Sequence, residues 1–272
     1  MGKTIGIISL KGGVGKTSTV VSLGAALSES GKKVLLIDGN LSSPSLGLHL
    51  NVVDPEKTLH HVLSRNSNPR EAIYDTGNFH VMPSSIFSRS KVSPLLLKTK
   101  IKGLKRSYDV IIVDSSPSLD EETLGVMLAS DEIFVVTTPD RPTLSATMKA
   151  IKLARQRGVP ISGLILNKVN DKSFEIPFED VERALEIPVL AVIPYDVEIL
   201  HALSEMEPYT TFKPKSKGSE EFRKLAAVVS GERYKQSRLR DFIRRMTPKK
   251  QDINREIFYE ELFGKGARKK GN

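Results

Sequence analysis

The sequence predicts a three-layer α/β fold, in which helices cover both faces of a mostly parallel sheet of about seven or eight strands. Short apolar runs rich in β-branched residues recur along the chain, and amphipathic stretches with helical periodicity separate them. Continuous apolar runs of this length are typical of strands buried on both faces of a parallel sheet. At 272 residues the chain is long enough for one large domain with a substantial core.

Seven segments are expected to be strands. Each is a short and nearly continuous apolar run, such as TIGIIS or DVIIVD. In chain order they are 4–9, 33–38, 79–83, 109–114, 132–138, 162–168 and 188–194. Because both faces of such strands are apolar, we expect helices above and below the sheet.

Helical stretches fill the gaps between these strands. The stretch 19–30 is followed by Gly31, and glycine commonly ends a helix. Pro142 lies just before the stretch 143–156, at a position where a helix tolerates proline. The last long helical stretch of the α/β pattern is 218–231.

A change in composition near Gly231 divides the chain. The sequence after it has no further buried strands and is polar, basic and interrupted by Pro248. The formal net charge is +9, and +7 of it belongs to residues 231–272. We therefore expect an α/β domain over residues 1–230 and a helical, basic C-terminal extension over 231–272.

Composition excludes several classes of function. The chain has no cysteine, which excludes a disulfide framework, a cysteine nucleophile, a cysteine-ligated zinc site and an iron–sulfur cluster. No apolar run approaches the roughly 20 residues of a membrane-spanning helix. The N-terminus runs directly into a strand-like segment without the apolar region of a signal peptide. These features are typical of a cytosolic protein.

The stretch SLKGGVGKTS at 9–18 has the composition of a phosphate-binding loop between a strand and a helix. Its glycines let backbone N–H groups turn toward phosphates, and the N-terminus of the following helix adds its positive end. Lys16 is placed to reach β- and γ-phosphates, and Thr17 to hold Mg²⁺. The residues expected to bind a nucleotide here are Gly12, Gly13, Val14, Gly15, Lys16, Thr17 and Ser18.

A second lysine, Lys11, distinguishes this loop from the general pattern G-x-x-x-x-G-K-[ST], which has glycine where this chain has Leu10. The stretch KGGVGKT resembles the deviant Walker A motif of the MinD/ParA family of ATPases, and the resemblance covers residues 1–230. It implies a P-loop NTPase fold of the SIMIBI type, ATP and Mg²⁺ as cofactors, and a homodimer that forms with ATP. In that family the extra lysine reaches the phosphates of the partner's ATP, so the resemblance implies this role for Lys11.

Further segments are similar to the same family. DVIIVDSSPS resembles its Walker B strand, which makes Asp114 the acid that orients the Mg²⁺ shell through water. LILNKV places Asn167 where the family's asparagine binds adenine, and VIPYD supplies Pro194 and Asp196 as candidates on the adenine side. The segment VLLIDGNLSSPSLGLHL is most similar to archaeal MinD-like proteins. The lack of cysteine argues against the iron–sulfur branches of the family.

One departure from the family lies at the end of the second expected strand. The family usually has D-x-D there, and this chain has Asp38, Gly39 and Asn40. The second carboxylate helps the family to position or activate the attacking water, whereas an asparagine can orient a water but cannot take its proton. A neutral amide suffices in some GTPases, so we expect slow, partner-dependent hydrolysis, with loss of hydrolysis as the alternative. The residues expected to carry catalysis are Lys11, Lys16, Asp38, Asn40 and Asp114.

The first segment of the extension, SRLRDFIRRM at 237–246, is expected to be a basic amphipathic helix. Its apolar residues follow the spacing i, i+3, i+4, i+7, and arginines flank them. They are Leu239, Phe242, Ile243 and Met246. Such a helix can bind a membrane surface, as in MinD proteins, or it can pack on a protein partner or on the domain itself.

The second segment, DINREIFYEELFG at 252–264, is expected to be a docking helix. Its apolar residues Ile253, Ile257, Phe258 and Leu262 lie along one side. Its charges are mainly acidic, which is a poor match to anionic lipid. We therefore expect this helix to dock on a partner or on its own chain.

Two weaker signals are interpreted structurally. His60 and His61 are adjacent, so on a helix they point about 100° apart and cannot share a metal ion, and we expect both to be solvated. Asp120, Glu121 and Glu122 are expected in a first helical turn, where acids interact favourably with the helix dipole. Their role is then structural, with contacts to a partner as an addition.

Together these features predict an ATP-dependent dimerising switch of the MinD type. Mg-ATP would drive dimerisation, the dimer would bind a membrane surface or a protein partner, and hydrolysis would release it, for intracellular positioning. One alternative is a DNA-binding partition ATPase of the ParA type, because the basic tail suits a phosphate backbone. Another is an ATP-dependent scaffold with little hydrolysis that acts through a protein partner. The expected location is cytoplasmic, with peripheral attachment at the inner face of the membrane.

Overall fold

The computed structural model describes residues 2–64, 67–88, 90–232 and 250–260. Within these residues eight strands form one sheet in the order β3-β4-β2-β5-β1-β6-β7-β8, and only the pair β3 and β4 is antiparallel. The strands are β1 Lys3–Ile8, β2 Val34–Asp38, β3 Tyr74–Asp75, β4 His80–Met82, β5 Val110–Asp114, β6 Glu132–Thr137, β7 Ile161–Val169 and β8 Val189–Pro194. The seven predicted strands and the mostly parallel sheet are confirmed, and β3 is an additional short edge strand.

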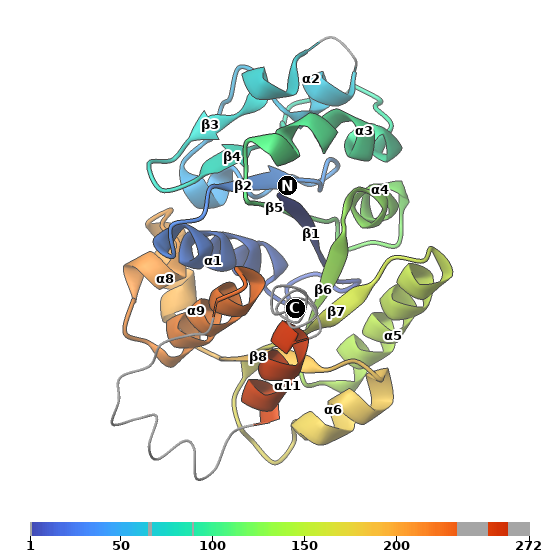
Figure 1. Cartoon of the computed structure of the whole chain (residues 1–272), viewed down its shortest axis with the longest axis vertical. Coiled ribbons are helices and arrows are strands. Elements are labelled where there is room, and N and C mark those ends of the chain that lie inside the picture. The colour runs from blue at the N-terminus through green and yellow to red at the C-terminus, as the bar shows by residue number, and fades with distance from the viewer. Residues whose placement is uncertain (1, 65–66, 89, 233–249, 261–272) are drawn as a thin grey trace, which may run out of the picture.

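Helices cover both faces of this sheet, as the three-layer prediction requires. Figure 1 shows α1, α8, α9 and α11 on one side of the central strands and α4, α5 and α6 on the other. The helices are α1 Lys16–Glu29, α2 Leu59–Leu63, α3 Leu97–Ile101, α4 Glu121–Ala129, α5 Arg141–Gln156, α6 Phe178–Leu185, α7 Glu198–Ser204, α8 Tyr209–Phe212, α9 Lys217–Val229 and α11 Lys250–Tyr259. Short 3-10 helices are η1 Leu48–Leu50, η2 Pro69–Ala72, η3 Pro94–Leu96 and η4 Lys102–Arg106. Gly31, two residues beyond α1, has a φ of 82°, as its predicted helix-ending role requires.

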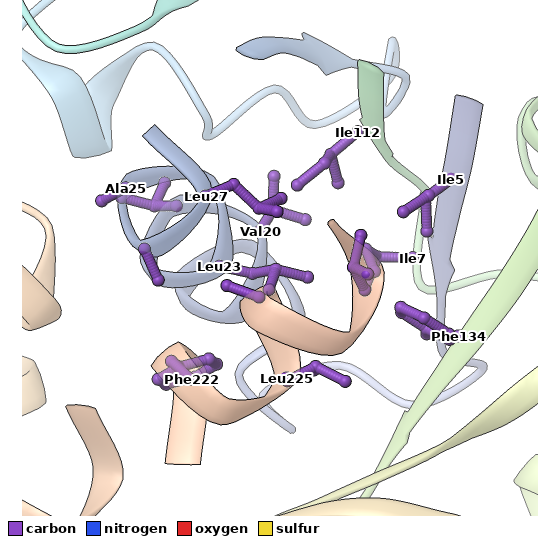
Figure 2. Close-up of a cluster of buried hydrophobic side chains, with 14 of the residues drawn as sticks. Ile5, Ile7, Val20, Leu23, Ala25, Leu27, Ile112, Phe134, Phe222 and Leu225 are labelled. Carbon is purple, nitrogen blue, oxygen red and sulfur yellow. The ribbon is translucent and has the colours of Figure 1, made fainter. Parts of the chain in front are cut away.

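Each face of the sheet has its own apolar core. Along β2, Val34 and Leu36 belong to one core and Leu35 and Ile37 to the other, because successive side chains of a strand point to opposite faces. Figure 2 shows the first core, where side chains of α1 and α9 meet those of β1 and β5. The near-continuous apolar character of the strands is therefore explained by burial on both sides.

The strand order places the candidate site. β1 lies between β5 and β6, and β5 separates it from β2. Because β1, β5 and β2 are parallel, the loops that follow them leave the same edge of the sheet. The carboxyl ends of parallel strands at such a point of reversed strand order are the usual place for a ligand in an open α/β sheet. The direct continuation of β1 into the loop before α1 brings residues 9–15 to this edge.

Helix α11 shows that the expected docking helix of the extension packs on its own chain. Phe258 is 5% exposed and belongs to the same core as α1 and α9, and its ring lies 6.1 Å from that of Phe134, centroid to centroid. Asn254 donates a hydrogen bond to the Val189 carbonyl at 3.0 Å, on the last strand of the sheet. The extension is thus continuous with the α/β core through this helix.

The buried side of α11 differs from the apolar side that the sequence suggests. The helix buries Gln251, Arg255 and Phe258, whereas Ile253 and Ile257 are 45% and 51% exposed. Arg255 occupies the buried side because buried acceptors on β8 and α9 satisfy its guanidinium. Leu262 and the segment with Leu239, Phe242, Ile243 and Met246 lie outside the described residues.

The expectation for His60 was wrong. Its side chain is only 4% exposed, and its Nδ1 accepts a hydrogen bond from the backbone N–H of Ser85 at 3.2 Å. Burial lowers the pKa of His60, and the neighbouring His61 lowers it further. The neutral ring is a structural contact between α2 and the loop after β4, while His61 is exposed as expected.

Candidate functional site

A pocket of about 420 Å³ opens at the carboxyl edge of the sheet, within the range of small-molecule sites. Segments that follow β1, β2, β5 and β8 line it together with the end of β7. The predicted site residues that line it are Lys11 to Ser18, Asn40, Asn167 and Asp196. In the described part of the chain, Asp38, Asp114 and Pro194 lie at strand ends next to this edge but do not line the pocket.

The loop after β1 has the backbone conformation that its glycines allow. Gly13 and Gly15 have φ angles of 78° and 88°, which a residue with a Cβ adopts only with strain. A Cβ at Gly15 would also collide with the amide of Asn167. The loop therefore passes very close to the end of β7, and Gly15 is required there for two reasons.

Lys16 is buried at the floor of the pocket, on the first residue of α1. Its side chain is 8% exposed, and Nζ donates to Asp114 Oδ1 at 2.8 Å and to the Ser115 carbonyl. Thr17 Oγ1 donates to the other carboxylate oxygen, Asp114 Oδ2, at 2.6 Å. One carboxylate at the end of β5 thus holds both side chains that the sequence assigns to phosphate and Mg²⁺.

Asp38 lies beside Asp114, because the two residues are direct partners in the register of β2 and β5. Burial raises the pKa of Asp38 to about 7, and the Asp114 carboxylate contributes to the rise. Asp38 accepts hydrogen bonds from the backbone N–H groups of Asn40, Ser45 and Leu46. In this structure Asp38 therefore holds the loop after β2 in place rather than facing the pocket.

Asn40 lines the pocket, and one of its buried hydrogen-bonding atoms has no partner among the described residues. Its side chain is 6% exposed, and Nδ2 donates to the Ser43 carbonyl. Oδ1 has no hydrogen-bond partner in the structure. A buried polar atom without a partner is rare in folded proteins, so this oxygen is available to orient a water or a ligand donor.

Asn167 has the same feature on the opposite side of the loop. Nδ2 donates to the Val14 carbonyl at 2.7 Å, while the buried Oδ1 has no partner. Asp196 accepts from the Tyr209 hydroxyl at 2.6 Å. Asn167 thus offers a hydrogen-bond acceptor to a ligand amine. Asp196 lines the pocket, but its carboxylate already has hydrogen-bond partners in the chain. Pro194 ends β8, two residues before Asp196.

Lys11 lies on the rim of the pocket, where its side chain is 43% exposed. Its Nζ donates to Thr143 Oγ1 at 2.7 Å and to Asp140 Oδ1 at 3.2 Å, at the N-terminus of α5. Burial raises the pKa of Asp140, but hydrogen bonds from Thr138 and Thr143, together with Lys11, outweigh this effect and lower the pKa to about 2. The side chain of Lys11 therefore points away from the phosphate loop and is held by residues at the start of α5.

Comparisons with known proteins agree with this geometry. Residues 2–157 match the model of a family described as an AAA domain. An uncharacterized ATP-binding protein of Methanocaldococcus jannaschii is 31% identical over 233 residues, which are 84% of this chain and 88% of that protein. The crystal structure of the cell division ATPase MinD from Pyrococcus furiosus is 39% identical and superposes with a TM-score of 0.79, covering 83% of this chain and 97% of that one.

The chain belongs to the MinD/ParA family of P-loop ATPases. A second solved structure, the septum site-determining protein MinD of Pyrococcus horikoshii in complex with Mg-ADP, is 38% identical, with a TM-score of 0.80 over 84% of this chain and 96% of that one. The predicted resemblance of KGGVGKT to this family is therefore confirmed.

A second family model, described as 4Fe-4S iron–sulfur cluster binding proteins of the NifH/frxC family, matches residues 124–243. An iron–sulfur cluster is held by cysteine thiolates, and this sequence has none. The match to this family model therefore does not bring the cysteine ligands of a cluster with it.

The pocket fits the Mg-nucleotide that MinD/ParA proteins bind. The backbone of Gly13 and Gly15 forms the loop, and the unpartnered Asn167 oxygen suits the amine of adenine. Within the described residues no three His, Asp or Glu side chains form a metal cluster. Oxygen ligands suit Mg²⁺, which proteins usually hold through one or two side-chain oxygens together with phosphates and water. Thr17 and, through water, Asp114 would hold it here.

Several pocket residues were not predicted. Ser45 Oγ lies 3.2 Å from Thr17 Oγ1, and His49, Tyr195 and Leu200 form part of the wall. None of them belongs to a motif with a fixed spacing. Ser45 and His49 lie within VLLIDGNLSSPSLGLHL and Tyr195 lies within VIPYD, so the sequence indicated these segments but not the individual residues.

Proposed function

We propose that this protein is an ATP-dependent molecular switch of the MinD type, which pairs with a second copy when Mg-ATP is bound and hydrolyses it slowly. The observation that carries this proposal is the contrast between two lysines of one loop. Lys16 is buried inside the pocket, and Lys11 lies on its rim. A single-site nucleotide pocket needs only the buried lysine, so the exposed one can serve a second subunit once it leaves its partners Asp140 and Thr143.

Bound Mg-ATP supplies the phosphoryl group, whose transfer to water breaks the bond between the γ-phosphorus and the bridging oxygen and leaves ADP and phosphate. Lys16 neutralises charge on the phosphates of its own subunit, and Lys11 reaches those of the partner. To do so, Lys11 leaves Asp140 and Thr143. The ion pair with Asp140 costs little to break because both side chains are 43% exposed, and the buried Thr143 hydroxyl keeps its hydrogen bond to Asp140. Turnover thus depends on two loaded subunits meeting.

The reaction is expected to be slow because of Asn40. Asn40 lines the pocket and its buried amide oxygen has no hydrogen-bond partner in the described part of the chain, so we expect this oxygen to orient the attacking water. An amide does not accept the water's proton, however, and general-base catalysis typically contributes about 10²–10⁴-fold. The protein then stays in its ATP state for long periods, which suits a switch better than a turnover enzyme.

The output of the switch is reversible attachment for intracellular positioning in cell division. The solved relatives are a cell division ATPase and a septum site-determining protein, which supports this process. A protein partner that stimulates or reads the ATP state is expected. Within the described residues no helix is long and apolar enough to span a bilayer, and the basic segment 237–246 is the proposed membrane contact, from the cytoplasmic side.

The decisive test replaces the two lysines separately. Lys16→Ala removes hydrogen bonds to charged groups worth about 1.5–3 kcal/mol each, so ATP affinity should fall by roughly 10–150-fold or more. Lys11→Ala should keep ATP affinity but lose dimerisation, measured by light scattering with ATP and with ADP, and lose turnover. Lys152→Ala, an exposed lysine of α5, is the matched control and should resemble the parent.

The opposite results are equally informative. A Lys11→Ala protein that dimerises and hydrolyses like the parent would rule out a lysine acting between subunits. A parent that dimerises with ATP but shows no hydrolysis would be an ATP-dependent scaffold, the second function that Asn40 permits.

Attachment is tested with liposomes of anionic and of neutral lipid, and with a DNA mobility shift. Liposome binding should be stronger with ATP than with ADP and should be lost in Phe242→Glu. Phe174→Glu, at an 81% exposed phenylalanine outside the extension, controls for the change in charge. Truncation after Gly231 is a poor substitute, because it would also remove Phe258 from the core. An ATP-dependent DNA shift without liposome binding would instead indicate the ParA-type alternative.

A further inference from the structure

The loop after β2 is held by two carboxylates from different elements. Asp38 accepts from N–H groups near both ends of the loop, as described above. Glu122, in the first turn of α4, accepts from the backbone N–H of Leu41 and of Ser42, each at 3.0 Å, and from Ser42 Oγ at 3.3 Å. The second set of contacts joins segments about 80 residues apart in the sequence.

The role of Glu122 is distinct from that of the other acids at the start of α4. Asp120 is the N-cap and accepts from Thr123 N at 3.0 Å. Glu121 is exposed in the same turn, so it contributes to the helix dipole as expected. Glu122 is half-buried and directs both carboxylate oxygens to the loop. Burial raises its pKa, and the neighbouring Asp120 carboxylate adds to this.

The contact fixes the peptide planes directly after Asn40. Charge-assisted hydrogen bonds are short and strong, and two of them on consecutive N–H groups leave the Leu41–Ser42 backbone little freedom. Asn40 is the residue immediately before. It lines the pocket, and its buried amide oxygen has no hydrogen-bond partner within the residues described. At the other end of the contact, α4 begins four residues beyond Pro117, which lies in the loop after β5 and also lines the pocket. Glu122 therefore links two segments that both line the pocket.

We propose that Glu122 is a positioning residue, which ties the Leu41–Ser42 backbone to α4 so that the Asn40 amide oxygen is held toward the nucleotide. This inference rests on the proposed ATP hydrolysis for its kinetic part. Its structural part, the link between the loop and α4, is independent of hydrolysis. The two parts are measured separately.

The structural part is tested by hydrogen exchange. In Glu122→Ala the amides of Leu41 and Ser42 should exchange at least about tenfold faster than in the parent, because hydrogen bonds to a charged acceptor are lost. Glu121→Ala removes the same charge from the same turn and should leave their exchange unchanged. Equal exchange in the two variants would overturn the proposal.

The kinetic part is tested by turnover. Glu122→Ala should lower kcat about tenfold while ATP affinity and the melting temperature stay near those of Glu121→Ala. Glu122→Gln, whose amide can still accept one N–H bond, should be intermediate. A loss of ATP affinity in place of kcat would show that Glu122 supports the fold of the pocket rather than the position of Asn40.

A double-mutant cycle with Asn40→Ala decides whether Glu122 acts through Asn40. If it does, adding Glu122→Ala to Asn40→Ala should change kcat little further, since residues that act as one unit are not additive. Losses that multiply in the double variant would overturn the proposal. A parent without ATP turnover would contradict the proposed hydrolysis, and hydrogen exchange alone would then support or overturn the link.

Discussion

The nucleotide pocket and the contact beneath α11 both bury charged side chains. The pocket differs in that two of its lining residues also have buried amide oxygens without a hydrogen-bond partner in the part of the chain that the structure describes. Lys16 and Asp114 pair at its floor with side chains 8% and 0% exposed. Beside them the amide oxygens of Asn40 and Asn167 are buried and have no partner. Such atoms cost stability unless a ligand or water satisfies them. The pocket is therefore less than optimally stable as it stands, as expected of a binding site.

Beneath α11 the buried charged side chains form ion pairs with one another. Arg255, with a side chain 5% exposed, donates to Glu221 Oε2 at 2.9 Å and to the Leu190 carbonyl at 2.7 Å, and Lys224 also pairs with Glu221 at 2.9 Å. Phe258 adds an apolar contact next to this pair. The comparison teaches that buried charge alone does not identify a function, whereas two unpartnered amide oxygens on residues that line one cavity support a binding site.

The largest expected effect concerns the apolar part of the α11 contact. Phe258→Ala should lower the free energy of unfolding by up to about 3–5 kcal/mol, the usual cost of deleting a buried phenylalanine side chain. The loss cannot exceed the free energy with which α11 docks, because an end helix can detach locally. Chemical denaturation measures it. Ile257→Ala, at a 51% exposed neighbour, should change stability by no more than about 0.5 kcal/mol, and equal effects in both variants would contradict the assigned buried face.

A smaller effect is expected from the charged part of this contact. Arg255→Met should cost about 1.5–3 kcal/mol at neutral pH, since Glu221 loses a hydrogen bond to a charged group but keeps Lys224. Burial raises the pKa of Glu221, but Arg255 and Lys224 outweigh this and lower it below the ordinary value of 4.5. The contribution of Glu221 to stability is thus present above that pH and lost as the pH falls through its lowered pKa.

Denaturation at pH 7 and at pH 3 tests the second half of this prediction. The difference in stability between parent and Arg255→Met should shrink at the lower pH as Glu221 takes up a proton. Glu256→Met, on the same helix and exposed, is the control for substitution of a charged residue there. A cost that stays the same at both pH values would mean that Arg255 acts mainly through its aliphatic part and the Leu190 carbonyl.

The two regions also differ in how far the sequence predicts them. The phosphate loop is fixed by residues adjacent in the chain, so Gly13, Gly15 and Lys16 could be placed from spacing alone. The docking face of α11 could not be predicted in this way. Hydrophobic periodicity assigns only apolar residues to a buried face, whereas the burial of Arg255 depends on its ion pair with Glu221 in another helix. The contact of Lys11 with the N-cap of α5 could not be predicted either, because it joins residues 129 positions apart in the sequence.

The sheet shows the same limit on a larger scale. Its seven main strands were predictable because each is an apolar run long enough to be recognised. β3 was not, because it consists of only two residues, Tyr74 and Asp75, one intermediate in exposure and one exposed. Its pairing with β4 follows from the turn between them rather than from a pattern of its own.

Within the pocket, the effect of Asn40 on the rate of ATP hydrolysis can be tested directly. Asn40→Asp should raise the hydrolysis rate if a base is the missing element, by about tenfold, below the roughly 10²–10⁴-fold of a well-placed general base. The gain is limited because Asp38 and Asp114 already crowd this edge with negative charge. Asn51→Asp, an exposed change of the same charge, should leave the rate unaltered. An unchanged rate with intact ATP binding would show that other groups position the water.

The smallest effect is expected on the rim of the pocket, where Lys11 meets Asp140. Both side chains are 43% exposed, and exposed ion pairs contribute only about 0.2–1 kcal/mol. Asparagine is as good an N-cap as aspartate, so Asp140→Asn should keep the bond to the Thr143 N–H and lower stability by less than about 1 kcal/mol at pH 7. Because the folded pKa of Asp140 is lowered from 3.8 to about 2, its contribution is present above pH 3.8 and should vanish as the pH falls through 2. Denaturation of Asp140→Asn, Lys11→Ala and the double variant gives the coupling energy, and a coupling above about 1 kcal/mol would mean that Lys11 is a structural residue of this subunit, not one held ready for a second.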